Sequence, residues 1–221
     1  IKYNPHIPLL EGEDAEWIEK LLELTTDYLH VYGGPRGDWP LAFCNPGFDA
    51  TLKVISGTHL PMATAKSWSA DELAWLREEI TRKVQQCILR RSTSPIASPC
   101  FVIDQPKKTG HKRYRLICDF RQLNQCIQPM SYSMGGKIRD HLEDFAGIKR
   151  FISNDAEGAF NQILIHEDDT WLTAIATPLG VFEYLRLPFG LNCAPSWYQL
   201  ASDRIFGGLD LDPASAVLRT W

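Results

Sequence analysis

The chain of 221 residues is long enough to bury a substantial core, and its 44% hydrophobic and 23% charged residues are ordinary for a globular protein. No run of about eighteen apolar residues occurs, so the sequence predicts no membrane-spanning helix. A net charge of −4 gives the chain as a whole no basic character, so a phosphate-binding surface would require a local excess of basic residues.

The first 46 residues are predicted to form a separate unit. Apolar residues recur at helical spacing over 13–30, which predicts an amphipathic helix. The glycines and prolines of 33–40 interrupt regular structure, so 33–46 is interpreted as a linker. Residues 1–49 carry nine acidic residues against three basic ones. We therefore divide the chain into an N-terminal helical or spacer segment, 1–46, and a main domain, 47–221.

The start of a second helix has the clearest local signal in the sequence. Ser69 and Glu72 have the spacing of a capping box, in which the two side chains bond each other's backbone N–H groups. Apolar residues then continue at helical spacing as far as Cys87 and Ile88. The pattern predicts a helix that begins after Ser69 and ends near Ile88.

A basic hairpin is predicted next. Segments 100–103 and 114–118 alternate as strands do, and a polar turn rich in lysine separates them. Residues 82–121 carry ten basic residues against two acidic ones, a local surplus of eight. Such a surplus is typical of a phosphate-binding surface, and it is equally compatible with a solvated basic face. Composition alone leaves both interpretations open.

The rest of the chain mixes strands and helices without strict βαβ alternation, which predicts an α+β fold. A helix is predicted over 137–146 and another from Ala194 to about Phe206. The predicted strands are 150–154 and 162–165, followed by a hairpin with arms 172–177 and 181–187. The six cysteines form no C-x-x-C pair, so we interpret them as free, mostly buried thiols.

Four stretches, in this order, resemble the conserved blocks of one family. They are RRSTSPIASPCFVI (90–103), YRLICDFRQLN (114–124), FISNDAEGAFNQILI (151–165) and FEYLRLPFGLNCAPSWYQ (182–199). Together they are similar to the reverse transcriptases of gypsy-type LTR retrotransposons, and the resemblance covers roughly 48–206. It implies a right-hand polymerase fold, with the fingers and the first half of the palm present.

The resemblance implies that Asp155 is the first catalytic aspartate of the palm. Nucleotidyl transfer by two metal ions needs carboxylate oxygens on a rigid support, and magnesium or manganese is the implied cofactor. The backbone carbonyl of Ala156 is the second implied metal ligand. Outside this motif, an Asp at that position is more simply a residue that caps a turn.

The resemblance also implies a nucleotide site. Phe160 matches the aromatic residue that excludes a ribose 2′-hydroxyl, and Gly158 and Ala159 line the pocket by backbone. Arg115 and Lys108 match the fingers residues that hold the triphosphate. Lys107 or Lys112 could replace Lys108 if the register of the turn differs. The alternative for Phe160 is a plain core residue. The alternative for Arg115 and Lys108 is that each is an exposed charge that keeps the protein soluble.

The Leu-Pro-Phe-Gly-Leu segment matches the block that contacts template and nucleotide. Phe189 is assigned to the nucleotide, and Pro188 and Gly190 to the template and primer, although Gly190 can also be explained as a turn glycine. Asp119 and Arg121 are interpreted as an internal ion pair. The acidic run 167–169 is interpreted as a solvated turn and not as a metal site.

No Asp-Asp turn resembling the family's second acidic pair occurs in the 221 residues; Asp210 and Asp212 are followed by Pro213 and do not fit it. The expectation is therefore part of an RNA-directed DNA polymerase that is inactive alone. The alternative is a non-catalytic module that binds RNA or a protein. The expected partners are an RNA/DNA primer-template, deoxynucleoside triphosphates and the remaining polyprotein domains, with no membrane. The expected location is cytoplasmic or nuclear.

Overall fold

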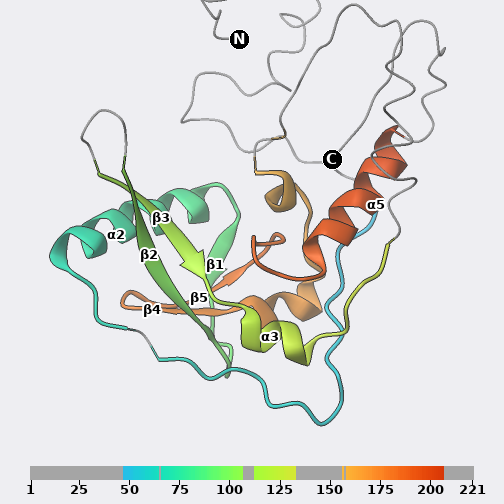
Figure 1. Cartoon of the computed structure of the whole chain (residues 1–221), viewed down its shortest axis with the longest axis horizontal. Helices are drawn as coiled ribbons and strands as arrows, with labels where there is room; N and C mark the ends of the chain where they lie inside the picture. The colour runs from blue at the N-terminus through green and yellow to red at the C-terminus, as the bar shows by residue number, and fades with distance from the viewer. Residues whose placement is uncertain (1–46, 65, 107–111, 133–155, 157, 207–221) are drawn as a thin grey trace, which may run out of the picture. The chain divides into compact units, whose positions relative to one another are not determined.

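The computed structural model describes residues 47–64, 66–106, 112–132, 156 and 158–206 (Figure 1). All of them belong to a compact unit that runs from Phe43 to Trp221. The predicted helix 13–30, helix 137–146, strand 150–154 and the boundary at residue 46 lie outside the described residues. These expectations stay predictions.

The described elements are named as in Figure 1. The α-helices are α2 (Ala70–Gln85), α3 (Arg121–Cys126) and α5 (Ala194–Phe206). The strands are β1 (Leu89–Arg91), β2 (Ser98–Pro106), β3 (Lys112–Cys118), β4 (Ile175–Thr177) and β5 (Gly180–Tyr184). Two 3₁₀ helices, η2 (Ala159–Gln162) and η3 (Glu167–Thr173), precede β4. The predicted α+β class is confirmed.

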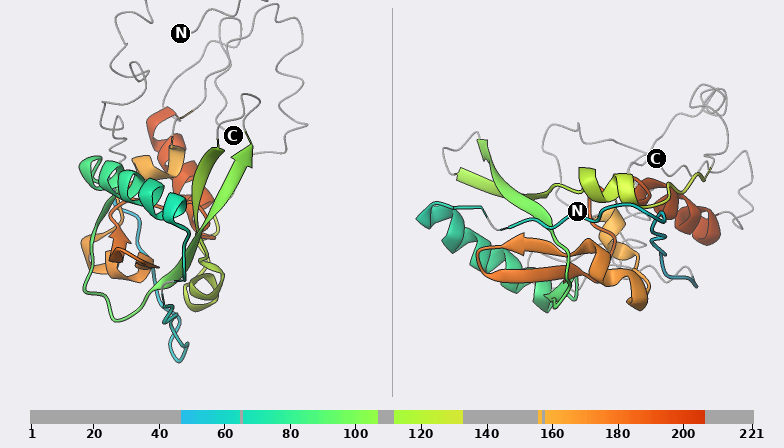
Figure 2. Two further views of the ribbon diagram at one scale, coloured as in Figure 1. Left: turned by 90° about the vertical axis from the view of Figure 1, so that its left-hand side faces the viewer. Right: turned by 90° about the horizontal axis from the view of Figure 1, so that it is seen from below.

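The strands form one sheet in the order β1-β5-β4-β2-β3. The β2–β4 pair is parallel, with Ser98 opposite Ile175, and the other pairs are antiparallel. Strand β2 pairs with β4 only over its first two residues and then continues with β3 as a two-stranded hairpin, which Figure 2 shows running past the shorter strands. The predicted pairing of the two hairpin strands is confirmed, and the strands are longer than predicted; the lysine-rich turn, 107–111, lies outside the described residues.

Helix α2 covers one face of the sheet, because it contacts both edge strands, β1 and β3. Its capping box is confirmed: the Ser69 hydroxyl accepts from Glu72 N at 3.3 Å, and Glu72 Oε2 accepts from Ser69 N at 2.8 Å. Leu76 and Ile80 are buried beneath it. The core continues through side chains from several elements, namely Ile88, Leu89, Phe120, Leu123, Ile163, Leu172, Ile175 and Leu187.

The predicted end of the second helix is wrong. Helix α2 ends at Gln85, and Cys87 adopts a positive φ of 51° that turns the chain into β1. Ile88 and Leu89 are therefore buried along the sheet, not along the helix. Their apolar spacing fits both arrangements, so periodicity could not distinguish between them.

Two predicted strands differ from the structure. Segment 162–165 was predicted to be a strand, but η2 extends to Gln162. The remaining residues pair only through two isolated bridges, Leu164 with Arg186 and Ile165 with Ala50. The first hairpin arm starts at Ile175 because 167–173 form η3, and the second arm, β5, ends at Tyr184. Helix α5 has the predicted bounds, whereas α3 and β1 were not predicted.

Candidate nucleotide and nucleic-acid site

The turn that carries Phe160 starts at a glycine whose conformation favours glycine. Gly158 has φ 59° and ψ 38°, in the left-handed region, where a Cβ atom would cause strain. The 3₁₀ helix η2 follows, and the Ile163 N–H donates to the Phe160 carbonyl at 3.1 Å to close it. Ala156, before the turn, is exposed. Asp155 lies outside the described residues.

Three aromatic rings meet above this turn. The ring centroid of Phe160 lies 5.0 Å from that of Phe189 and 6.0 Å from that of Tyr198 in α5. Both separations are typical of attractive aromatic pairs. Phe189 is 50% exposed, so this aromatic cluster (Phe160, Phe189 and Tyr198) offers an open flat surface to solvent.

Helix α3 holds the loop that carries Phe189. The Asn124 side chain donates from Nδ2 to the Gly190 carbonyl at 2.8 Å, and its Oδ1 accepts from Asn192 N at 2.9 Å. Gly190 has φ 99°, and a Cβ placed there would lie 3.6 Å from the Phe120 ring. Pro188 is buried. The loop is therefore fixed on its inner side and open on the outer side.

Arg115 lies on the face of the β2–β3 hairpin that points away from α2. The preceding residue, Tyr114, packs against Trp75 of α2 with ring centroids 5.8 Å apart and the rings tilted by 55°, and successive strand residues point to opposite faces. Arg115 is exposed and pairs across the strands with Ile103, which is 44% exposed. Phe101 lies on the same face, with Lys66 Nζ 5.6 Å from its ring centroid. The hairpin thus presents a mixed apolar and basic surface.

The structure divides the predicted site residues into two groups. One group comprises Gly158, Ala159, Phe160, Pro188, Phe189 and Gly190, on η2 and the loop before α5, with Phe160 and Phe189 in contact. Arg115 belongs to the other group, on the hairpin. Asp155 and Lys108 lie outside the described residues. Their assigned roles remain predictions.

Two residues that shape this site were not predicted from the sequence. Tyr198 packs edge-on against Phe160, and Asn124 fixes the Gly190 loop. Both lie inside the quoted blocks, in SWYQ and in RQLN. Only their partners far along the chain distinguish them from ordinary helix residues.

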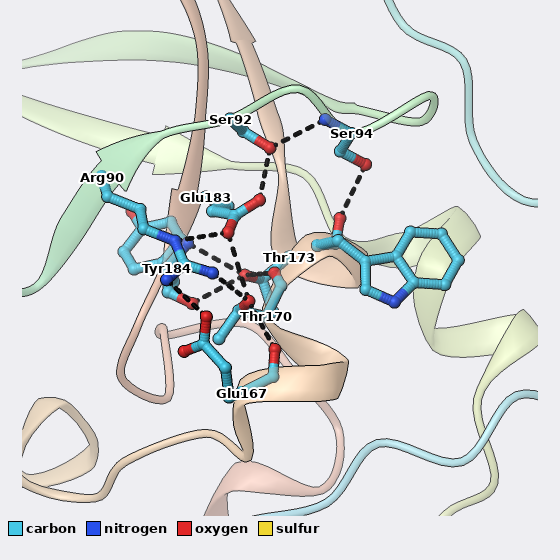
Figure 3. Close-up of polar contacts among 9 residues, drawn as sticks. Arg90, Ser92, Ser94, Glu167, Thr170, Thr173, Glu183 and Tyr184 are labelled. Carbon is cyan, nitrogen blue, oxygen red and sulfur yellow. Dashed lines mark hydrogen bonds and ion pairs between the residues drawn. The ribbon is translucent and has the colours of Figure 1, made fainter.

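A second cluster of charged side chains joins β1, β5 and η3 (Figure 3). Arg90 donates from Nε to Glu183 Oε1 at 2.7 Å and pairs through Nη1 with Glu167 at 2.6 Å. Glu183 is 5% exposed, and it also accepts from the hydroxyls of Ser92 and Thr170. We call this set, with Ser94 and Thr173, the Glu183 network.

The Glu183 network does not have the geometry of a metal or catalytic site. Each of its carboxylates is engaged by the Arg90 guanidinium, and Ser94 Oγ donates to the Trp171 carbonyl at 2.9 Å. Within the described ranges, no group of three His, Cys, Asp or Glu side chains could hold a metal ion. The run 167–169, predicted to be a solvated turn, is exposed at Asp168, whereas Glu167 pairs with Arg90 and Asp169 Oδ2 accepts from Leu52 N at 2.9 Å.

The described cysteines are free thiols. Desolvation raises the pKa of the buried Cys100 to about 12 and that of the half-buried Cys118 to about 11. A thiol with such a pKa is protonated at neutral pH and is a poor nucleophile. These two residues therefore suit a structural role. The predicted ion pair of Asp119 with Arg121 is present at 2.6 Å, but it is not internal as predicted, because the Arg121 side chain is 88% exposed.

Comparison with known proteins identifies a family. A family model described as reverse transcriptase (RNA-dependent DNA polymerase) matches residues 105–217. The retrovirus-related Pol polyprotein from transposon opus of Drosophila melanogaster is 37% identical over 201 residues, which cover 90% of this chain and 19% of that protein. The corresponding protein from transposon gypsy is 33% identical over 133 residues, 59% of this chain and 13% of that protein.

The structural comparison agrees. A foamy viral protease-reverse transcriptase, solved in complex with an RNA/DNA hybrid, matches with a TM-score of 0.64 and 17% identity over 91% of this chain and 26% of that chain. At this identity the likeness shows the fold. The chain spans only 19% and 13% of the lengths of the two curated relatives named above. No described helix is both long and apolar enough to cross a membrane.

Proposed function

The chain belongs to the reverse transcriptase family, as its LTR-retrotransposon blocks predicted, and we propose that it supplies the nucleotide-binding part of an RNA-directed DNA polymerase. The observation that carries the proposal is the contact of Phe160 with Phe189, with small residues immediately before Phe160. A half-exposed aromatic surface beside a glycine turn suits a sugar and a base, because flat rings give close contact with little side-chain entropy to lose.

In this proposal the sugar of the incoming deoxynucleotide lies on the Phe160 ring. A 2′-hydroxyl would meet that ring, so a ribonucleotide is excluded by sterics. Gly158 and Ala159 allow the backbone to come close to the nucleotide. Phe189 contacts the nucleotide and the exposed Gly190 contacts template or primer, whereas Pro188, also assigned to template and primer, is buried and supports this loop from its inner side. The tethering of Gly190 by Asn124 keeps this surface in place.

The triphosphate is assigned to Arg115 and Lys108. Arg115 is exposed on the outer face of the hairpin, where its guanidinium is accessible for bidentate phosphate contact. Phe101 and Lys66 share that face and extend the surface for nucleic acid. Magnesium or manganese would be held by the Asp155 carboxylate and the Ala156 carbonyl, because hard cations prefer oxygen donors, and would stabilise charge on the transferred phosphoryl group.

The proposed partners follow from these assignments: an RNA/DNA primer-template, deoxynucleoside triphosphates and the other domains of a Pol polyprotein. The proposed site of action is inside the cell, in cytoplasm or nucleus. We further propose that the 221 residues alone do not extend a primer, because they contain no Asp-Asp turn that matches the second acidic pair.

The test combines binding with primer extension. Binding of the 221-residue chain to a labelled RNA/DNA primer-template is measured over a salt series, and we expect the affinity to fall as salt rises. Arg115→Ala should reduce the slope of log K against log salt by about one. Arg77→Ala, an exposed change on α2, is the matched control and should leave the slope unchanged.

Extension is then measured with the 221 residues and with the complete polypeptide in which they occur, each with an Asp155→Asn control. Extension by the complete polypeptide that Asp155→Asn abolishes would support the proposal. Binding without extension in the complete polypeptide would favour the non-catalytic binding module. Extension by the 221 residues alone would mean that the second acidic group is supplied by residues not recognised in this sequence.

A further inference from the structure

Arg186 is a buried arginine that none of the assignments above uses. It lies between β5 and the loop that carries Phe189, three residues before that ring, and is 5% exposed. Burying a guanidinium is costly unless its donors meet acceptors, so its bonds are informative about its role. Long cationic side chains on a strand more commonly extend to solvent.

The Arg186 guanidinium bonds the end of the η2 turn. Its Nη1 lies 3.2 Å from the Gln162 carbonyl and 3.4 Å from the Asn161 carbonyl. Carbonyl groups at the C-terminal end of a short helix lack partners within the helix, and basic side chains commonly satisfy them. Arg186 therefore caps the turn that starts with Ala159 and carries Phe160.

The backbone around Arg186 joins the same two segments. Leu164 and Arg186 form an antiparallel bridge, and Leu187 N donates to the Ile163 carbonyl at 3.0 Å. The main-chain contacts fix the segment after the η2 turn, whereas the guanidinium reaches the turn itself. Phe160 directly precedes Asn161, so the position of its ring depends on how that turn is held.

We propose that Arg186 is a positioning residue, whose buried guanidinium caps the η2 turn and fixes the Phe160 ring against Phe189, which sets how strictly the site distinguishes deoxyribose from ribose. The consequence for the sugar rests on the proposed function, in which Phe160 lies beneath it. The bracing itself rests on the contacts of Arg186. Both carbonyls are bonded by the one nitrogen Nη1, so a lysine ammonium, a point charge with its own N–H donors, should restore part of the contact.

The bracing is tested first in the 221-residue chain labelled with 4-fluorophenylalanine. The ¹⁹F resonances of Phe160 and Phe189 are assigned by Phe160→Leu and Phe189→Leu. In Arg186→Met we expect both resonances to shift or broaden, with that of Phe101 on the hairpin unchanged. Arg186→Lys should give a smaller change, and Arg77→Met, the exposed control, none. Unchanged resonances of Phe160 and Phe189 in Arg186→Met would overturn the proposal.

Urea unfolding of the same variants separates positioning from general stability. We expect both Arg186 variants to unfold cooperatively. Loss of cooperative unfolding in both would also overturn the proposal, because Arg186 would then support the whole fold and not the position of one turn. Arg186→Lys provides the milder of the two changes if Arg186→Met alone fails to fold.

The consequence is tested by primer extension with the complete polypeptide. We expect Arg186→Met to lower the preference for deoxynucleotides over ribonucleotides on the order of tenfold, since small displacements of positioning groups have effects of this size or larger. Arg186→Lys should restore part of the preference. An unchanged preference in a variant that still extends primers refutes the sugar assignment. A wild-type polypeptide that does not extend at all refutes the proposed function, whereas the ¹⁹F result still decides the bracing.

Discussion

The Glu183 network and the aromatic cluster are linked by β5 and its continuation to Phe189, and they are built in opposite ways. The network closes on itself: Glu183 is 5% exposed and accepts from side chains of β1, η3 and the segment after β1. The aromatic cluster is open, with Phe189 50% exposed, and the Phe160 ring packs at 5.0 Å from that of Phe189 and at 6.0 Å from that of Tyr198. At Glu183 the segment is held by hydrogen bonds from three side chains, whereas at Phe189 it leaves an exposed surface for a ligand.

The difference indicates a division of labour along one stretch of chain. Buried charges must be paired, so the network specifies how β1 and η3 pack on β5. That packing sets where β5 leaves the sheet and thus where the loop of Phe189 begins. The aromatic cluster contributes less to stability and leaves an exposed surface at Phe189. Mutations in the two regions should therefore separate stability from ligand binding.

Glu183→Ala is expected to have the largest effect on stability. It leaves Arg90 without its buried partner and removes the acceptor of the Ser92 and Thr170 hydroxyls. The Arg90 side chain is 40% exposed and keeps Glu167, so the loss is that of charge-assisted hydrogen bonds, about 1.5–3 kcal/mol of unfolding free energy. Urea unfolding followed by circular dichroism measures it, and Glu78→Ala, on the exposed face of α2, is the control. A loss below about 1 kcal/mol would mean that the network contributes little to stability.

Local signals in the sequence predicted the parts of the fold that depend on neighbours in the chain. The Ser69 capping box, the β2–β3 hairpin and the start of α5 at Ala194 all follow from adjacent residues. The end of α2 and the 3₁₀ helix η3 were missed because burial against the sheet, a long-range effect, decides them. Propensity and periodicity contain no information on such contacts.

The candidate site shows the same limit. Resemblance to a family indicated Phe160 and Phe189, and the structure places their rings 5.0 Å apart. The supports of these rings could not be predicted, because Arg186 and Asn124 act on segments that lie far from them in the sequence. A buried arginine and a helix asparagine have no local pattern that distinguishes them from surface residues. Their roles become visible only with tertiary contacts.

Gly190→Ala tests the aromatic side of the comparison and should have an intermediate effect. Gly190 has φ 99°, so alanine is strained by about 1–2 kcal/mol, although a Cβ meets its neighbours only at 3.6 Å. Gly57, with φ 81° and nothing within 4 Å of a Cβ, is the matched control. Both variants should lose similar stability in urea, and only Gly190→Ala should weaken primer-template binding. Equal binding by both variants would contradict the assignment of Gly190.

The pair of Asp119 and Arg121, with Arg121 on the surface, gives the smallest expected effect and the sharpest contrast with the pair that the buried Glu183 forms with Arg90. Hydrogen bonds from Arg121 lower the pKa of Asp119 from its ordinary value of 3.8 to about 2. Because the folded-state pKa is the lower one, the pair stabilises the fold above about pH 4, and this contribution disappears as the pH falls towards 2.

The difference in urea midpoint between the wild type and Asp119→Asn should therefore be small at pH 7 and shrink as the pH falls from 4 to 3. High salt should shrink it at pH 7 as well, because an exposed pair is screened. Glu183→Ala should keep most of its effect in high salt, since the Glu183 carboxylate itself is buried and its bonds are screened less. A midpoint difference for Asp119→Asn that grows towards low pH would contradict the depressed pKa.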